Sequence, residues 1–598
     1  MALLQRIALW STRIGYAFFP SWPDLSGPSI AARACGDGPD KPGHDEKAYA
    51  GISIGLRLAI AALLLAHPAA AADAHRDLSI GVASFPSTLH PAIDPDLIKF
   101  YLLGFADRPV TTHDASGQVV CLLCTEVPSL ANGGARLEGD GMAVTFRFRP
   151  GLQWGDGAPL GAEDLAFTAR VGHDPNSGFA DTHAWAIISH VDVVDPQTAV
   201  VHFAERNYQF DQLGQILPAH LEAAVFDRAK GPAAYMQQSN YNTAPTNPGL
   251  YNGPYLITGF DTGARVVLER NPRWQGAKPF FDRIAVKTIG NTAALQSNLL
   301  SGDVDMVPGE GIGLTLDQVL ALQKQYPDRF VYTYKPNMAY THIDLQLDNP
   351  ILADSRVRRA LLMGIDRKSM VDKLMGGRVA VANSFASPQQ PVYSADAPAY
   401  PYDPARARAL LAEAGWTPGP DGICRNAAGQ RLTLEFATST GVRVRELLQQ
   451  VMQSEWRRIG VETIIHNEPP RTLFGETLKH RAFKGLAMFA WVSGIESSPR
   501  QTLSSGQIPT SANNWGGGNY PGFHDATMDA DIDAMEKELD PARRRPLWTE
   551  MQRLYAEQLP VLPLFYGADA HVWPVWLKGV APTGFRLSTL SVEDWRAE

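Results

Sequence analysis

The chain has 598 residues, more than one hydrophobic core usually supports, so two or more domains are expected. Hydrophobic residues make up 45% of the sequence and charged residues 19%, which excludes a disordered chain. The formal net charge of −9 argues against nucleic acid or an anionic membrane as a partner and suits a small or zwitterionic ligand.

A signal peptide is predicted within residues 1–72. Arg57 precedes the apolar run Leu58–Ala66, and Ala70 and Ala72 are small residues suited to cleavage after Ala72. A membrane anchor needs about 20 apolar residues, roughly twice the length of this run. No cysteine lies at the cleavage point, so a secreted protein without a lipid anchor is expected.

Residues 1–50 precede this signal, although a signal peptide normally stands at the N-terminus. We therefore expect them to be a gene-start artefact or a disordered leader, with translation beginning near the signal. Cys35 would then be absent from the mature protein.

The remaining cysteines are Cys121, Cys124 and Cys424. Cys121 and Cys124 fit either a local disulfide in an oxidising compartment or half of a metal site. A zinc site needs two more ligands, and no nearby Cys or His pair has suitable spacing. Structural cysteines, buried or joined in a disulfide, are therefore favoured.

In chain order, the mature sequence opens with Asp77–Ser84, a β-branched run that predicts a strand. A β-rich region with Thr145–Pro150 and Ala199–Phe203 follows, and Gly161–Val171 between these runs predicts a helix. The polar sequence between Gly231 and Pro254 predicts an irregular loop that crosses between domains.

Strand and helix signals then alternate. Strands are predicted at Arg265–Arg270 and Arg283–Ile289, followed by a helix at Ala293–Gly302. Further on, the helical pattern of Val442–Gly460 lies between two strand-like runs, which predicts a βαβ unit. This alternation indicates a parallel or mixed sheet covered by helices.

Two later segments have clear local signatures. Tyr402–Trp416 predicts a helix with Asp403 as its N-cap and Pro404 in its first turn. Gly485–Trp491 predicts a strand with Trp491 at its C-terminal end. In open α/β sheets, ligands bind at the carboxyl ends of strands.

The mature sequence contains no motif that is typical of an enzyme active site. The mature chain has no HExxH, GxSxG or Walker motif, and the histidines show no metal-ligand spacing. The glycine-rich Gly309–Gly313 lacks the spacing of a dinucleotide loop and predicts a surface turn. No catalytic residue, metal or cofactor is therefore expected.

Several separated motifs carry a resemblance to a known family. They are Pro150–Phe167, Gly249–Trp274, Asp354–Asp372, the helix ending in Ala414–Trp416, and Leu559–Gly567. In this order they resemble the extracellular solute-binding proteins of ABC importers, in the peptide-binding group. The resemblance extends from about Asp77 to Trp595.

The resemblance implies an α/β fold of the periplasmic-binding-protein type, with two α/β lobes, hinge crossings and an extra N-proximal domain. The expected parts are the leader and signal peptide (1–72), lobe I (76–115, 249–345 and 565–598), the extra domain (116–248) and lobe II (346–564).

The resemblance also suggests ligand-binding residues. In peptide-binding relatives, a strand ending in Trp is followed by an Asp that holds the ligand's α-ammonium. This sequence has Gly494 or Ile495 at that position, and only Glu496 nearby could replace the Asp. Trp491 either contacts the ligand or packs in the core.

Four further candidates are less closely tied to the pattern. Asn513, Asn514 and Trp515 either present amides to a ligand or shape a glycine-rich turn. Tyr101 is a cleft candidate on the segment after the first strand.

The resemblance implies a soluble, monomeric periplasmic receptor that binds a peptide or peptide-like solute. It would deliver this solute to the permease of an ABC importer driven by cytoplasmic ATPases. Modified or cyclic peptides, opines and glycoconjugates all remain open as ligands. The alternatives are an exported hydrolase of cell-wall peptides and a sensor or chaperone module.

Overall fold

The computed structural model describes residues 75–94, 96–180, 185–231, 233–513 and 515–598. The predicted signal peptide and leader lie outside the described residues. Within the described part of the chain, no helix is both long enough and apolar enough to cross a membrane.

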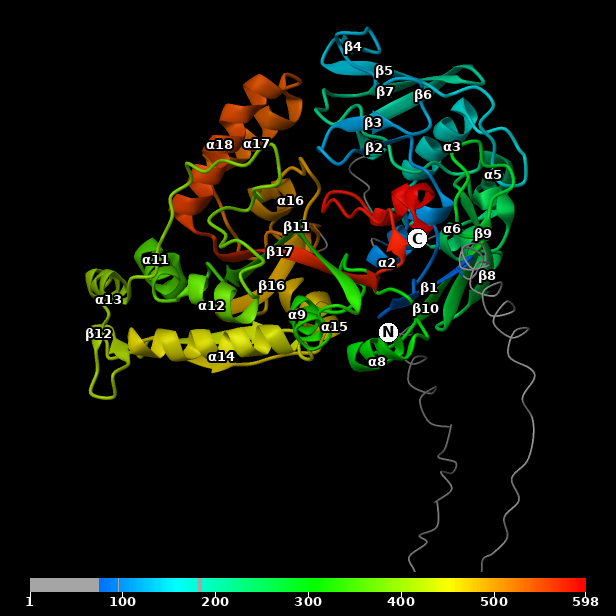
Figure 1. Ribbon diagram of the computed structural model, residues 1–598. Coiled ribbons are helices and arrows are strands. Elements are labelled where there is room, and N and C mark those ends of the chain that lie inside the picture. The colour runs from blue at the N-terminus through cyan, green and yellow to red at the C-terminus, as the bar shows by residue number, and fades with distance from the viewer. Residues whose placement is uncertain (1–74, 95, 181–184, 232, 514) are drawn as a thin grey trace, which may run out of the picture. The chain divides into compact units, whose positions relative to one another are not determined.

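A four-stranded mixed sheet has the strand order β1-β10-β9-β8 (Figure 1). Its strands are β1 (Asp77–Val82), β8 (Tyr255–Asp261), β9 (Arg265–Arg270) and β10 (Arg283–Thr288). The strands predicted to begin at Asp77, Arg265 and Arg283 are confirmed. Because β1 pairs in parallel with β10, the start of the described chain is joined to a segment far along the sequence.

Two helices pack on this sheet. Helix α2 (Leu97–Ala106) packs against β8, and helix α8 (Thr292–Ser301) packs against β1. The Asn291 side chain accepts a hydrogen bond from Ala294 N at 2.8 Å and so caps α8. The helix predicted in this part of the sequence is confirmed.

A five-stranded sheet has the order β15-β14-β16-β11-β17. Its strands are β11 (Phe330–Leu345), β14 (Thr433–Thr438), β15 (Glu462–Ile465), β16 (Leu486–Val492) and β17 (Val561–Pro574). Helix α14 (Arg443–Arg458) joins the parallel strands β14 and β15, which confirms the predicted βαβ unit. Trp491 lies one residue before the end of β16, also as predicted.

A third sheet has the order β4-β5-β7-β6, and the separate hairpin β2–β3 precedes it in the sequence. The strands are β2 (Thr111–His113), β3 (Val119–Cys121), β4 (Ala135–Glu138), β5 (Gly141–Arg147), β6 (Ile188–Asp195) and β7 (Thr198–Phe203). Helix α3 (Ala162–Gly172) packs on β6 and β7. Cys121 and Cys124 form a disulfide, so the metal alternative for this pair is wrong.

The segment between Gly231 and Pro254 is more ordered than its sequence predicts. It contains α6 (Ala234–Gln238), α7 (Asn240–Thr243) and the short 3₁₀ helix η1 (Pro248–Leu250). The Ser239 side chain caps α7, and the buried Tyr241 hydroxyl donates to Leu250 O at 3.1 Å. Side-chain hydrogen bonds thus organise a polar sequence that lacks a periodic apolar pattern.

The remaining helices surround these sheets. They are α5 (Ala219–Arg228), α9 (Leu316–Gln325), α10 (Pro350–Ala353), α11 (Ser355–Met363), α12 (Arg367–Leu374), α13 (Pro404–Glu413), α15 (Pro470–Thr472), α16 (Arg500–Leu503), α17 (Ala526–Lys537) and α18 (Pro541–Gln558). Short elements are β12 (Thr417–Pro418), β13 (Cys424–Arg425), β18 (Leu577–Lys578), β19 (Arg596–Ala597), η2 (Leu473–Leu478), η3 (Ser505–Gln507), η4 (Ser511–Asn513) and η5 (Ser588–Asp594). Helices α17 and α18 lie side by side (Figure 1). The Asp403 carboxylate accepts from Arg406 N, which confirms the predicted cap of α13.

Strands β11 and β17 pair along their lengths and connect two hydrophobic cores. Phe330 and Val572 belong to a cluster with α8 and α9, whereas Ile343 and Leu562 belong to the core of the five-stranded sheet. Regular pairing is interrupted between Pro336 and Tyr340. The interruption therefore lies between the two cores, on the two strands that join them.

Candidate functional site

A cavity of about 520 Å³ lies where β11 and β17 lose their regular pairing and where β16 ends. Its wall is formed by parts of the chain that are far apart in the sequence. These are the hairpin β2–β3, residues 212–215, 310–311, 337–339, 492–493, β17 and the C-terminal segment 582–590. A cleft bounded by several elements at the carboxyl end of a strand is a typical ligand site.

Two carboxyl groups meet in the cavity wall. Glu310 Oε1 accepts a hydrogen bond from Ser588 N at 2.9 Å, and Asp569 Oδ1 accepts one from Asn337 Nδ2 at 2.8 Å. Glu310 Oε2 is buried and has no hydrogen-bond partner among the described residues. The wall therefore presents acceptor oxygens whose bonding capacity the protein leaves open.

The environment of these carboxyl groups disfavours their charge. Burial, together with a smaller contribution from the neighbouring Asp569 charge, raises the pKa of Glu310 to about 7. Burial likewise raises the pKa of Asp569 to about 6. A cation entering the cavity would relieve both effects, because an opposite charge favours the ionised form.

The backbone before Glu310 brings these groups together. Gly309 lies so close to β17 that an added Cβ would be 2.8 Å from Asp569 Cβ. Glu310 itself has a left-handed backbone with φ 55, a conformation that costs a residue other than glycine about 1 kcal/mol or more. Such strain is found more often at functional sites than elsewhere.

His571 supplies a neutral donor to the same wall. Its side chain is almost fully buried, and its Nδ1 accepts a hydrogen bond from Gly309 N at 3.0 Å. Burial lowers the pKa of His571 to about 4, so the ring is neutral and carries its proton on Nε2. Nε2 has no hydrogen-bond partner among the described residues. Arg586 adds a positive charge to the wall.

The predicted cleft loop after β16 contributes to the cavity through Val492 and Ser493, which were not among the predicted residues. Gly494 is held in its own turn, where its N donates to Ser497 Oγ at 2.6 Å and its O accepts from Gln390 Nε2 at 2.8 Å. Ile495 is buried and lies near Gly117 at the tip of the hairpin β2–β3. Neither Gly494 nor Ile495 lines the cavity.

Glu496 already has a cationic partner. Its carboxylate lies 3.3 Å from the Arg544 guanidinium of α18, and the Arg544 side chain is 8% exposed. The Glu496 main-chain oxygen accepts from the Tyr208 hydroxyl at 2.5 Å. These two contacts of Glu496 hold the loop in place. The Glu496 carboxylate is already paired with a cation, whereas Glu310 Oε2 has no partner among the described residues.

Trp491 packs beside the cavity. Its ring is half-buried and lies 5.5 Å from the Phe489 ring and 5.9 Å from the Tyr520 ring, measured between ring centroids. It does not line the cavity, although its neighbour Val492 does. The packing alternative accounts for its position.

Asn513 and Trp515 do not line the cavity. Asn513 bonds within its own turn, accepting from Thr510 N at 2.9 Å and donating to Ile508 O at 2.8 Å. Asn514 lies outside the described residues, and Trp515 packs edge-on against His480 with a centroid distance of 4.9 Å. The turn interpretation accounts for the Asn513 side chain.

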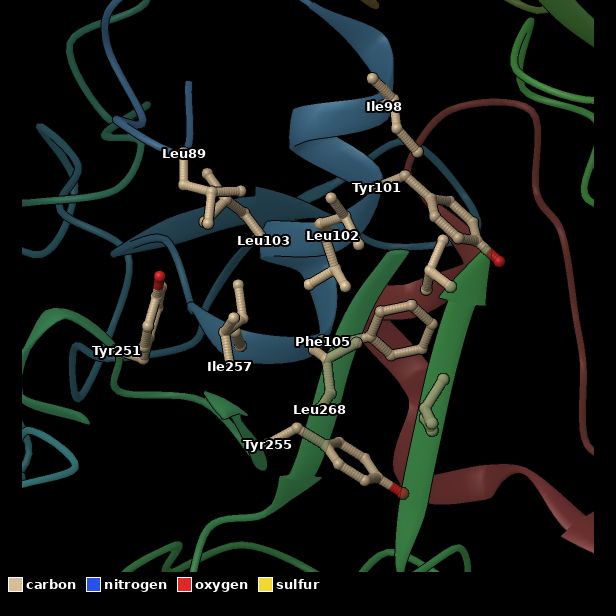
Figure 2. Packing of buried hydrophobic residues seen from close by; sticks show 14 of the residues in the cluster. Leu89, Ile98, Tyr101, Leu102, Leu103, Phe105, Tyr251, Tyr255, Ile257 and Leu268 are labelled. Atoms are coloured by element: carbon tan, nitrogen blue, oxygen red, sulfur yellow. The ribbon is translucent and has the colours of Figure 1, made fainter. Parts of the chain in front are cut away.

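Tyr101 is a core residue rather than a residue of the cavity surface. It is fully buried on α2 and packs against Phe105 (Figure 2). Burial raises its pKa well above the usual value, and the Glu310 charge adds to this effect. The hydroxyl has no partner among the described residues. Tyr101 therefore lies behind the wall that carries Glu310.

Sequence reasoning missed Glu310, Asp569 and His571. A weak signal existed at Glu310, which is a charged residue within the glycine-rich Gly309–Gly313. Asp569 and His571 interrupt an otherwise apolar strand with polar side chains. Neither signal indicates that the two segments meet, since that depends on how β17 pairs.

Comparison with known proteins gives a consistent result. Residues 125–521 match the family model described as bacterial extracellular solute-binding proteins, family 5. The oligopeptide-binding protein OppA of Mycobacterium tuberculosis is 28% identical over 439 residues, covering 70% of this chain and 68% of that protein. The nickel-binding periplasmic protein of Escherichia coli is 24% identical over 470 residues, covering 77% and 83%.

A solved structure shares the fold. The oligopeptide binding protein from Thermus thermophilus complexed with a pentapeptide aligns with a TM-score of 0.73 at 26% identity. The alignment covers 87% of this chain and 96% of that structure.

Proposed function

Since this chain belongs to the bacterial extracellular solute-binding proteins of family 5, we propose that it binds a peptide or peptide-like solute and delivers it to an ABC importer. The resemblance identified from the sequence motifs is confirmed by the family match, and the expected α/β fold of this type by the structural neighbour. The receptor function follows from family membership and from relatives named for oligopeptide binding. These findings give no support to the exported hydrolase.

The observation that carries the proposal is the cavity of about 520 Å³ at the interruption between β11 and β17. We propose that Glu310 and Asp569 meet a positively charged group of the ligand, and that Arg586 meets a negatively charged one. A buried ammonium or carboxylate needs such a partner. A zwitterionic peptide carries both groups.

Glu496 is the alternative partner for a ligand ammonium, as the family pattern implies. Its role stays a prediction. The ion pair between Glu496 and Arg544 favours Glu310 and Asp569, because a ligand at Glu496 would have to displace an existing cation.

We further propose a division of the described chain into lobe I (76–115, 249–345 and 565–598), an extra domain (116–248) and lobe II (346–564). The three separate sheets support this division in outline. Strand β11 runs from one core to the other, because Ile343 belongs to the core of the five-stranded sheet, so the change from lobe I to lobe II falls within this strand. Closure by bending at the β11–β17 interruption would enclose the ligand, in a hinge motion.

The proposal includes export to the periplasm as a monomer, partnership with a permease and its ATPases, and no catalytic activity. Cleavage after Ala72 is expected, so N-terminal sequencing of the secreted protein should begin at Asp73. A different first residue, or retention of the protein in the cytoplasm, would contradict this part.

The test of binding is native mass spectrometry of the purified protein followed by a thermal-shift screen with peptides, opines and glycoconjugates. Ligand at a hundredfold excess over Kd should stabilise the protein by about 2.7 kcal/mol. No shift with any of these compounds counts against the receptor. Turnover of peptidoglycan fragments would favour the hydrolase instead.

A further inference from the structure

Two imidazoles and a carboxylate lie close together on β6 and β7, the last two strands of the third sheet. His190 on β6 and His202 on β7 are cross-strand partners, and their rings stack with centroids 4.2 Å apart. Asp192 follows His190 by two residues, which places it on the same face of β6. None of the three lines the cavity.

The hydrogen bonds of His202 determine which ring nitrogen carries the proton. Nδ1 lies 3.0 Å from Glu138 Oε2 on β4. A surface carboxylate is ionised at neutral pH and can only accept a hydrogen bond. Nδ1 of a neutral His202 is therefore protonated, and Nε2 bears the lone pair.

His190 has the same tautomer for a similar reason. Ser189 Oγ donates its single proton to His202 O at 3.0 Å. The contact of 3.0 Å between Ser189 Oγ and His190 Nδ1 therefore requires Nδ1 to be the donor. Nε2 of His190 bears a lone pair as well.

Both lone pairs lie near Asp192. His202 Nε2 is 3.3 Å from Asp192 Oδ2, and His190 Nε2 is 4.0 Å from Asp192 Oδ1. His202 Nε2 has no hydrogen-bond partner among the described residues, although little of the His202 side chain is exposed. In these neutral tautomers, three electron-pair donors therefore lie close together with no proton between them, an arrangement that a cation would stabilise.

We infer that His190, Asp192 and His202 bind a divalent transition metal of the zinc, nickel and copper class. The three ligand atoms lie within 4.8 Å of one another. Bonds of about 2.0–2.1 Å bring ligand atoms closer than this, so the exposed side chains of His190 and Asp192 would rotate inward when the metal binds. Water would complete the coordination.

Glu138 takes the position of an outer-shell partner. A carboxylate that accepts from the second nitrogen of a ligating histidine orients the ring and makes it a better ligand. Because β6 is the edge strand of its sheet, the metal would tie this edge to β7. The inference does not depend on the proposed receptor function.

The experiment is isothermal titration of Zn²⁺, and separately of Ni²⁺, into the untagged full-length mature protein after removal of metals with EDTA. We expect one equivalent to bind. His190→Gln, Asp192→Asn and His202→Gln should each weaken binding at least tenfold, and Glu138→Gln should weaken it by about 10- to 100-fold.

The matched control is His220→Gln in the same domain. His220 lies 3.0 Å from the Asp156 carboxylate but is not part of a three-ligand group among the described residues. This variant should bind the metal as the wild type does. Unchanged thermal unfolding of each variant without metal shows that the fold is retained. If His202→Gln unfolds, His190→Gln is the variant to use, because His190 is exposed.

Two results would overturn the inference. The first is no stoichiometric binding of Zn²⁺ or Ni²⁺, which would leave a protonated His202 between Glu138 and Asp192 as the explanation. The second is equal binding by the wild type and the four variants. Tetrahedral Co²⁺ absorption bands in the wild type, lost in His190→Gln, would support it independently.

Discussion

At the scale of single residues, ligand chemistry depends on which carboxylate is free to meet a cation. Glu496 is paired with Arg544, whereas Glu310 Oε2 is buried and has no partner among the described residues. Asp569 lies beside Glu310 and raises its pKa. A positively charged ligand therefore gains more at Glu310 and Asp569 than at Glu496, where it would compete with a guanidinium.

We predict that Glu310→Gln weakens binding of a peptide with a free amino group by more than tenfold. The amide keeps the shape of the side chain but removes the charge that the ammonium needs. Glu496→Gln is the comparison and should leave affinity within about threefold. Isothermal titration measures both, with an N-acetylated peptide as control, which should bind the two variants equally. The opposite order of effects would assign the ammonium to Glu496.

The raised pKa values also predict how the stability of the free protein depends on pH. Burial raises the pKa of Glu310 from 4.5 to about 7 and that of Asp569 from 3.8 to about 6. The folded protein holds these protons more tightly than the unfolded chain, so the contribution of these two groups to the free energy of unfolding should fall as the pH rises from about 4 to 7. The buried His571, whose pKa is lowered, contributes with the opposite sign over this range, so the contribution of Glu310 is measured against a variant. For the half-buried Glu310 the loss is on the order of 2 kcal/mol.

Urea denaturation at pH 5 and pH 8 measures this dependence in the wild type and in Glu310→Gln. The variant lacks the titrating group, so the wild type should lose stability relative to the variant between pH 5 and pH 8. An equal change in both proteins would show that Glu310 does not titrate as its surroundings imply.

At the level of secondary-structure elements, the antiparallel strands β11 and β17 both join two hydrophobic cores and form part of the cavity wall. Their outer parts belong to two different cores, and their irregular middle forms the cavity wall. Gly567 on β17 faces this irregular part, where an added Cβ would lie 2.2 Å from Asn337 Oδ1. Asn337 in turn donates to Asp569. Backbone packing and the anionic wall are therefore coupled.

We predict that Gly567→Ala destabilises the protein by about 1–3 kcal/mol and weakens ligand binding. The methyl group would push Asn337 away and remove its hydrogen bond to Asp569. Gly290→Ala is the matched control, because nothing lies within 4 Å of an added Cβ at that position. Thermal unfolding and ligand titration measure the two effects. Equal behaviour of both variants would contradict the coupling.

At the scale of the whole molecule, the proposed function needs the two lobes to close on the ligand. The hairpin β2–β3, the end of β16 and the C-terminal segment contribute to one cavity although they belong to different sheets or loops. Contacts such as that between Tyr208 and Glu496 bridge the extra domain and lobe II in this division of the chain. A ligand held by all of these parts would favour the closed arrangement.

We predict that ligand binding reduces the radius of gyration measured by small-angle X-ray scattering. When the wild type and Gly567→Ala are both saturated with ligand, the reduction should be smaller in the variant. The added methyl group strains β11 and β17 at the point where they are proposed to bend. Identical scattering of the free and saturated wild type would show that binding does not require closure.

The family, the fold class and many single elements could be predicted from the sequence. Local rules suffice for β9, for α13 with its Asp403 cap, and for the βαβ unit around α14, because propensity, capping and periodicity act over a few residues. The position of Trp491 near the end of β16 follows from the same rules. The short helices between Gly231 and Pro254 were missed because side-chain caps, not apolar periodicity, form them.

The sites depend on contacts that local rules do not contain. Glu310 and Asp569 meet only because β17 returns to pair with β11, and Glu496 is occupied only because α18 brings Arg544 to it. The metal-ligand group likewise depends on the register that sets His190 opposite His202. Short-range preferences and the order of motifs are therefore enough to predict the elements and the family. Which charges are paired and which are free depends on long-range strand pairing, which exists only in the folded chain.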